Sequence, residues 1–209
     1  MRAVVFAPLH NTGGKHDADE FHREAHAFCR TNGVADQVHL IDNRAPTNMR
    51  RDQVEARIEA LPPRSLDVLA IFAHGWPTGL QTGHTLSTLP SLAKALSRAA
   101  VGPLSVVLYA CSTAADDDGS DADERAPGPG GEGGFADCLR DALAAQNCPA
   151  TIWAHTVRGH TTRNPYVRVF RPGHAVGGEW LVEPRSAGWP QWVSALRGER
   201  RFTFWRDFP

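Results

Sequence analysis

The chain has 209 residues, which is enough for one domain with a substantial hydrophobic core. Its formal net charge of −1 gives no basic surplus that would favour binding of nucleic acid or of an anionic membrane surface. No apolar run approaches the roughly 20 residues that span a bilayer, and residues 1–8 predict a first strand rather than a signal peptide.

The cysteines are too few and too widely spaced for a disulfide scaffold or a zinc knuckle: they are Cys29, Cys111, Cys138 and Cys148. We therefore expect a reducing, cytoplasmic setting and no metal or other cofactor. The ten histidines make metal binding worth testing, and His22 and His26 stand four residues apart on a predicted helix. Their surroundings do not match the H-E-x-x-H motif, so a solvated helix face is the favoured interpretation.

The first half of the chain alternates strand-like and helix-like segments. Strands are predicted at residues 3–7, 37–41 and 67–73. Helices are predicted at residues 17–30 and 50–61, where apolar side chains recur at helical spacing. The unbroken apolar run at 67–73 is typical of a strand that is buried on both faces of a parallel sheet.

The second half continues the alternation. It predicts helices at 89–100 and 135–145, and strands at 104–110, 151–155 and 166–170. Strand–helix alternation predicts an α/β fold, a three-layer α/β/α sandwich with a mainly parallel central sheet. Residues 116–134, acidic and then rich in Gly and Pro, predict a mobile loop. The Trp-rich region 160–209 predicts hairpins and loops on the sheet, within a single domain that covers residues 1–209.

Two of the buried strands end in chemically reactive side chains. His74 and Gly75 follow the first of these strands, and Cys111 follows the second, 37 residues later. That separation holds one helix and one strand, so both side chains are expected at the carboxyl edge of the sheet. An imidazole can take the thiol proton and later protonate a leaving amine. The backbone N–H groups of Gly75 and Cys111 are the predicted oxyanion hole.

The stretches 69–75 (LAIFAHG) and 106–114 (VVLYACSTA) resemble the caspase-like cysteine peptidases, which include caspases, metacaspases, clostripain, separase and bacterial CHAT domains. The resemblance covers roughly residues 3–155, and the Gly133-Gly134-Phe135-Ala136 helix start is similar to that of bacterial members. It implies the caspase-like fold and peptide-bond hydrolysis by a Cys111–His74 dyad. The caspase pentapeptide Q-A-C-[RQG]-G is absent, so the chain is expected nearer to the bacterial relatives than to true caspases.

The substrate-binding residues are expected close to the nucleophile and after the fifth strand. Asp116 and Asp118 follow Cys111, and an acidic pocket would favour Arg or Lys in the substrate. His160 and Arg163 are the other candidates, and Arg163 would favour an acidic residue instead. Both specificities remain open. The expected partner is a protein or peptide substrate. No binding of nucleic acid or of a membrane is expected, and a regulatory partner protein is compatible with this interpretation.

Three interpretations of the loop 116–134 remain open: a solvated linker, a calcium site and a cleavable activation loop. An EF-hand frame with Gly119 at its sixth position would place Ala114 first and Arg125 last, so that motif fails. Arg125 lies in a stretch that a protease could reach.

The leading functional hypothesis is a cysteine endopeptidase with a Cys–His dyad, possible cleavage after a basic residue and possible activation by a cut in the 116–134 loop. Two alternatives stand beside it. One is a catalytically silent caspase-like adaptor or scaffold module. The other is a non-peptidase amide hydrolase or acyl transferase that uses the same dyad.

Overall fold

A computed structural model describes residues 2–12, 17–31, 37–122, 130–158, 167–173 and 178 of the chain. Its helices are α1 (Asp17–Thr31), α2 (Thr47–Glu59), α3 (Leu89–Ala99) and α4 (Phe135–Ala145), with the short 3₁₀ helix η1 (Leu86–Thr88). Its strands are β1 (Ala3–Pro8), β2 (Val38–Ile41), β3 (Leu66–Phe72), β4 (Gly75–Trp76), β5 (Gly79–Leu80), β6 (Ala100–Tyr109), β7 (Ala150–His155) and β8 (Val167–Phe170). Among the described helices, none has the length and apolar character needed to cross a membrane.

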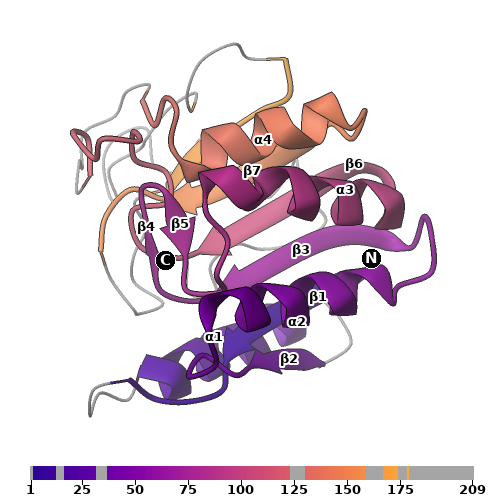
Figure 1. Cartoon of the computed structure of the whole chain (residues 1–209), viewed down its shortest axis with the longest axis vertical. Coiled ribbons are helices and arrows are strands. Elements are labelled where there is room, and N and C mark those ends of the chain that lie inside the picture. Colours follow the sequence, from indigo (N-terminus) through magenta and orange to yellow (C-terminus); the bar gives the residue numbers. More distant parts are fainter. Residues whose placement is uncertain are drawn as a thin grey trace.

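The described strands form a six-stranded central sheet in the order β2-β1-β3-β6-β7-β8 (Figure 1). All neighbouring pairs are parallel except β7 and β8, which are antiparallel. The strands β4 and β5 form a separate small hairpin. The prediction of a mixed α/β fold with a mainly parallel sheet is therefore confirmed.

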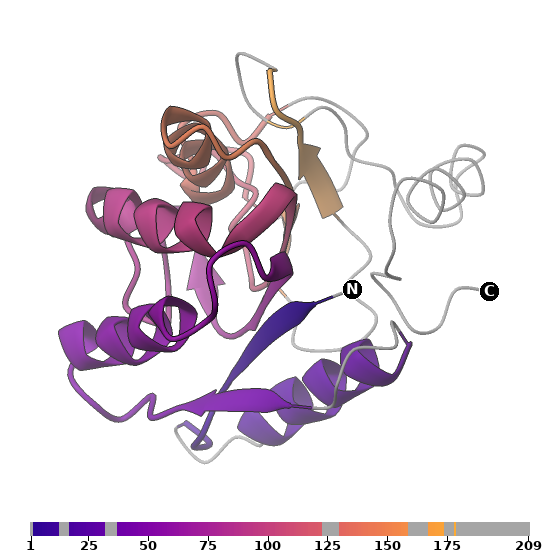
Figure 2. The same ribbon diagram turned by 90° about the vertical axis from the view of Figure 1, so that its right-hand side faces the viewer.

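Helices cover both faces of this sheet, as the alternation of side chains along each strand requires. In β3, Leu69 and Ile71 pack in one cluster with side chains of α2, α3 and α4. Val68, Ala70 and Phe72 point the other way and pack in a second cluster with α1. Figure 2 shows α1 on one side of the sheet and α2, α3 and α4 on the other. The described residues thus form three layers.

Most element boundaries agree with the sequence to within a few residues. The largest shift is in β6, which begins at Ala100 rather than at residue 104. Its pairing with β3 jumps from Leu66–Ala100 to Val68–Ser105, so the intervening residues of β6 bulge out of the ladder. The β4–β5 hairpin was not predicted, because two-residue strands leave no periodicity to detect.

The described ends of the 116–134 loop are tied to the body of the protein. One carboxylate oxygen of Asp121 accepts the Asp116 N–H at 2.6 Å, and the other accepts the Gly131 N–H at 2.9 Å. The same Asp121 forms an ion pair of 2.5 Å with Arg168, which is buried in β8. Residues 123–129, with Arg125 among them, lie outside the described residues, as does most of the Trp-rich region 160–209.

Candidate active site

His74 and Cys111 follow the ends of two neighbouring strands at the same level. Phe72 of β3 pairs in register with Tyr109 of β6, and each candidate residue comes two positions later. Phe72 and Tyr109 both face α1, and the His74 ring lies on the same side, against Asp17 and Phe21 of that helix. Parallel neighbours in a sheet are about 4.8 Å apart, so the ends of these two strands bring the backbones that carry His74 and Cys111 close together. Of the Cys111 surface, 9% is exposed.

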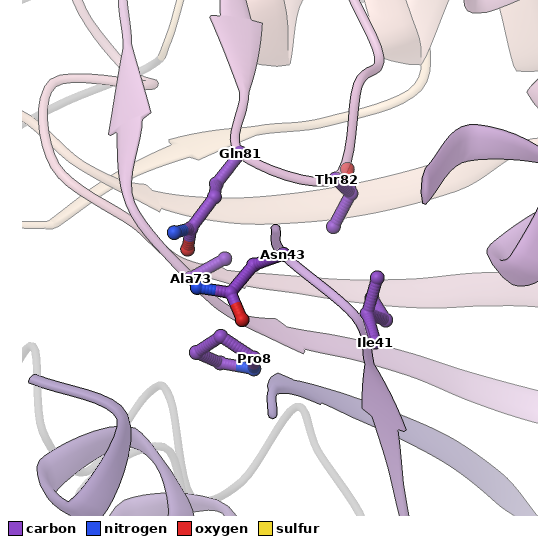
Figure 3. A pocket seen from close by; sticks show the side chains of 6 residues that line it. All are labelled: Pro8, Ile41, Asn43, Ala73, Gln81 and Thr82. Carbon is purple, nitrogen blue, oxygen red and sulfur yellow. The ribbon is translucent and has the colours of Figure 1, made fainter. Parts of the chain in front are cut away.

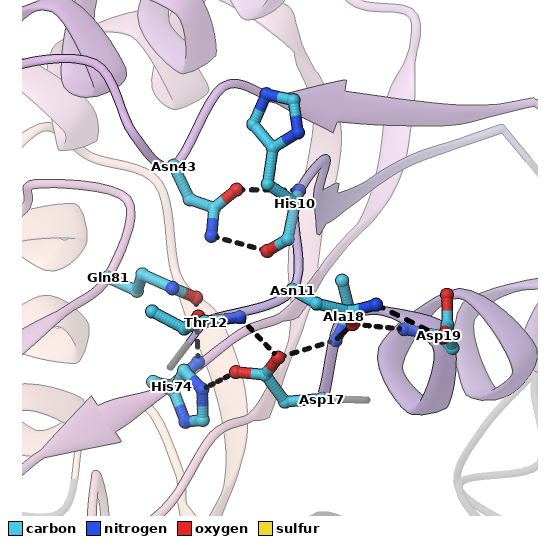
Figure 4. Close-up of polar contacts among 9 residues, drawn as sticks. All are labelled: His10, Asn11, Thr12, Asp17, Ala18, Asp19, Asn43, His74 and Gln81. Carbon is cyan, nitrogen blue, oxygen red and sulfur yellow. Dashed lines mark hydrogen bonds and ion pairs between the residues drawn. The ribbon is translucent and has the colours of Figure 1, made fainter. Parts of the chain in front are cut away.

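The His74 ring is held by two side chains from α1. Its Nε2 lies 2.6 Å from the Oδ2 of Asp17, the first residue of that helix (Figure 4). The Phe21 ring meets the imidazole edge-on, with 5.3 Å between the ring centroids. Asp17 was not among the residues predicted from the sequence, and it adds a carboxylate to the predicted dyad.

Asp17 is itself fixed by the start of α1 and the loop after β1. Its Oδ1 accepts the Thr12 N–H at 2.9 Å and the Ala18 N–H at 3.0 Å, and Asn11 caps the helix by accepting the same Ala18 N–H (Figure 4). Burial alone would raise the pKa of the Asp17 carboxyl, but the hydrogen bonds from His74 and Thr12 outweigh it. The pKa is therefore held well below its ordinary value, and Asp17 is ionised at neutral pH.

The ionised carboxylate decides which imidazole nitrogen carries the proton. An ionised Asp17 can only accept hydrogen bonds, so neutral His74 must carry its proton on Nε2. The lone pair then lies on Nδ1, which is the nitrogen that can accept a proton from a thiol. This is the protonation state that a general base next to a cysteine requires.

The turn after Cys111 has an unusual backbone. Ser112 has φ +54°, in the left-handed region that side chains other than glycine rarely adopt. The turn is fixed by the Ala114 N–H, which donates to the His155 carbonyl of β7 at 3.0 Å, and by the Thr113 hydroxyl, which donates to the Ala110 carbonyl at 3.0 Å. Such a backbone costs of the order of 1–3 kcal/mol, and residues of this kind cluster at functional sites.

Gly75 is required by packing on this turn. A Cβ at position 75 would lie 2.7 Å from the Thr113 methyl group and 2.9 Å from the Cys111 carbonyl oxygen. The missing side chain therefore lets the β4 backbone approach the Cys111 turn closely. The oxyanion hole of Gly75 and Cys111 N–H groups stays a prediction.

The hairpin after His74 adds polar and aromatic groups beside the site. The Gln81 side-chain oxygen accepts the His74 N–H at 3.3 Å, and the Gln81 N–H donates to the His74 carbonyl at 2.9 Å. Trp76 leaves 43% of its surface exposed. The sequence signal that could have found this hairpin is the Pro77-Thr78-Gly79 turn tripeptide, which follows His74 closely.

The predicted substrate-binding residues have different surroundings. The Asp116 carboxylate accepts the Glu132 N–H at 2.8 Å and the Ser120 hydroxyl at 3.1 Å, so its oxygens hold the loop together. Asp118 is exposed, and one of its oxygens accepts the Ser120 N–H at 2.8 Å. His160 and Arg163 lie outside the described residues.

The other cysteines sit in settings that suppress reactivity. Burial raises the pKa of the Cys148 thiol, and burial together with the nearby Asp137 raises that of Cys138. Cys29 is fully buried in α1.

The predicted histidine pair is embedded in the fold rather than fully solvated. His22 and His26 are half-buried, and the His22 Nε2 lies 2.5 Å from the Pro8 carbonyl oxygen. Within the described residues, no cluster of three or more His, Cys, Asp or Glu side chains could hold a metal ion.

Two cavities lie away from the Cys111 thiol. A small one of about 10 Å³ lies behind the hairpin, between Ala73, Gln81 and the carboxyl ends of β1 and β2 (Figure 3). A depression of about 460 Å³ lies at the amino ends of β6 and β7, at the opposite edge of the sheet, and is lined by residues that include Val101, Pro103 and Pro149.

No model of a known protein family, no curated protein and no solved structure matches this chain. The resemblance to caspase-like peptidases therefore stays a prediction.

Proposed function

We propose that this protein is a cysteine hydrolase of the caspase-like type that cleaves peptide bonds with Cys111 as nucleophile. His74 is the general base and acid, and Asp17 orients it. The observation that carries this proposal is the 2.6 Å contact between His74 Nε2 and the Asp17 carboxylate. His74 follows the end of β3, and Cys111 follows the end of the neighbouring strand β6. A histidine held in one tautomer next to a cysteine is the arrangement that nucleophilic thiol chemistry needs.

The proposed reaction begins with transfer of the Cys111 thiol proton to His74 Nδ1. The thiolate attacks the carbonyl carbon of the peptide bond, and the Gly75 and Cys111 N–H groups stabilise the oxyanion. His74 then gives its Nδ1 proton to the nitrogen as the C–N bond breaks, which leaves a thioester on Cys111. Water attacks the thioester with His74 as base, and the acid product leaves while Cys111 regains a proton. Asp17 stabilises the imidazolium each time His74 holds the extra proton.

Cleavage after a basic residue is the specificity that the acidic loop favours. Asp118 presents an exposed carboxylate seven residues after Cys111, and it can pair with an Arg or Lys side chain. A peptide library that varies the residue before the scissile bond tests this directly. Preference for an acidic residue at that position would instead point to Arg163.

The test of the proposed function compares Cys111→Ala with Cys138→Ala, since Cys138 is a half-buried thiol outside the site. We expect Cys111→Ala to abolish both peptide hydrolysis and labelling by a peptide acyloxymethyl ketone, and Cys138→Ala to leave both intact. Equal labelling of the two variants would contradict the proposal. A folded wild-type protein that hydrolyses no peptide and still binds a protein partner would favour the silent adaptor, and hydrolysis of small amides alone would favour the non-peptidase alternative.

A further inference from the structure

Gln81 contacts both sides of the His74 backbone. Its N–H donates to the His74 carbonyl at 2.9 Å, and its side-chain oxygen accepts the His74 N–H at 3.3 Å. The first bond is available to almost any residue at this position, whereas the second requires an acceptor on a side chain of this length. Together they fix the peptide groups that set the direction of the His74 side chain.

Gln81 is in turn held by α2. The Arg50 guanidinium donates to the Gln81 carbonyl at 2.6 Å and to the Thr47 hydroxyl at 2.9 Å. Gln81 is 9% exposed and lies against the small cavity behind the hairpin, beside Ala73 (Figure 3). The residue is thus anchored from the helix layer opposite α1.

The contacts of Asp17 and Gln81 with His74 are complementary. Asp17, from the α1 layer, fixes the far nitrogen of the ring, while Gln81 fixes the backbone from the other layer (Figure 4). A ring held at Nε2 alone can still swing Nδ1 away if its backbone shifts. A displacement of about 1 Å at a reacting group can cost roughly 100-fold in rate.

We propose that Gln81 is a positioning residue that, through its side-chain amide, holds His74 so that Nδ1 faces Cys111. This rests on the proposed function for its effect on catalysis, but the position of His74 can be measured without it. Gln81 touches no reacting atom and acts only through His74.

The test replaces Gln81 with Leu, which keeps the size of the side chain and removes the acceptor. Gln53→Leu is a matched control, because the Gln53 side-chain oxygen also accepts a backbone N–H, that of Asp42 at 3.0 Å. We expect Gln81→Leu to lower kcat by roughly 10- to 100-fold with KM little changed, and to alter the pH dependence of Cys111 alkylation by iodoacetamide. Gln53→Leu should leave both unchanged even if it lowers the melting temperature.

A second measurement does not depend on turnover. Proton NMR should show the His74 Nε2–H resonance in the wild-type protein and in Gln53→Leu. The resonance is assigned to His74 by its loss in Asp17→Asn. It should be shifted or broadened in Gln81→Leu and restored towards wild type in Gln81→Glu, which keeps an acceptor. An unchanged resonance and unchanged kcat in Gln81→Leu would overturn the positioning role, whatever the reaction. Failure of the proposed function would appear differently, as a wild-type protein without Cys111-dependent hydrolysis.

Discussion

At the scale of single residues, the feature that most changes the chemistry is the contact between Asp17 and His74, which stand 57 positions apart. Asp17 is the first residue of α1, and its carboxylate points towards the His74 ring. Hydrogen bonds from the Thr12 and Ala18 N–H groups hold the carboxylate in that orientation. The strand ends that carry His74 and Cys111 were predictable, because each follows a buried apolar run. The role of Asp17 was not predictable, because aspartate is common at the start of helices. Its contact with His74 depends on how α1 packs against the sheet.

Replacing Asp17 with Asn tests its role in orienting His74. The amide cannot stabilise an imidazolium and can present an N–H towards Nε2, which favours the wrong tautomer. We expect kcat/KM for peptides to fall by roughly 100- to 10,000-fold. Asp67→Asn is the control, because Asp67 also accepts a backbone N–H, from Arg2 at 2.8 Å, but at the opposite edge of the sheet. Steady-state kinetics should show full activity in the control, and a similar loss in both variants would contradict the assignment.

At the scale of elements, the turn from Gln81 to His84 is unusual because it is both polar and buried. Gln81, Thr82 and His84 are all buried polar residues. Loops normally lie at the surface, so the polar groups of this turn need partners inside the protein. Thr82 bonds the Nδ1 of His84 at 2.8 Å, and the His84 Nε2 lies 3.4 Å from Glu55 of α2. The turn is therefore docked on α2, and it carries Gln81 to His74.

Gly83 makes this docking possible, and its replacement tests it. Gly83 has φ +90°, and a Cβ there would overlap the Thr47 carbonyl oxygen. We expect Gly83→Ala to lower the free energy of unfolding by roughly 2–4 kcal/mol through backbone strain and overpacking. Gly102→Ala is the matched control, since a Cβ at Gly102 meets no atom within 4 Å. Urea titrations should show little change for the control, and equal stability of the two variants would refute the docking argument.

At the scale of the whole molecule, the pattern of apolar runs was sufficient to predict the sheet and its layers. Continuous runs such as 67–73 must be buried on both faces, and that requires helices on each side. What the sequence did not reveal is how the loops converge on the carboxyl edge of the sheet. The short β4–β5 hairpin and the ties from Asp121 to Arg168 depend on single contacts between distant segments, which leave no periodic pattern.

The carboxylates of Asp17, Glu55 and Asp121, which are buried or half-buried, predict acid sensitivity of the whole fold. The pKa of Glu55 is lowered chiefly by its hydrogen bond from His84, and those of Asp17 and Asp121 are lowered despite burial by the hydrogen bonds they accept. Because the unfolded chain binds these protons more readily, stability should be full above about pH 5 and fall progressively as the pH drops through about 4 and below.

Thermal unfolding at pH 6 and pH 3 checks this dependence. We expect Glu55→Gln to narrow the difference in melting temperature between the two pH values, because it removes one of the groups whose protonation opposes folding. The exposed Asp52 of α2 provides the control as Asp52→Asn, which should keep the wild-type difference. An identical narrowing in both variants would show that Glu55 has no special part in acid unfolding.

The order of strands also determines how the polypeptide could be divided. Asp17, His74 and Cys111 all precede residue 122, whereas α4, β7 and β8 follow residue 130. A break between those two positions would leave Asp17, His74 and Cys111 on one piece, and the other piece would carry β7 and β8 at the far edge of the sheet. The parallel ladder of β6 with β7 and the ion pair of Asp121 with Arg168 would then become contacts between two chains. The border between β6 and β7, which is a parallel ladder within one chain, would then be an interface between two pieces.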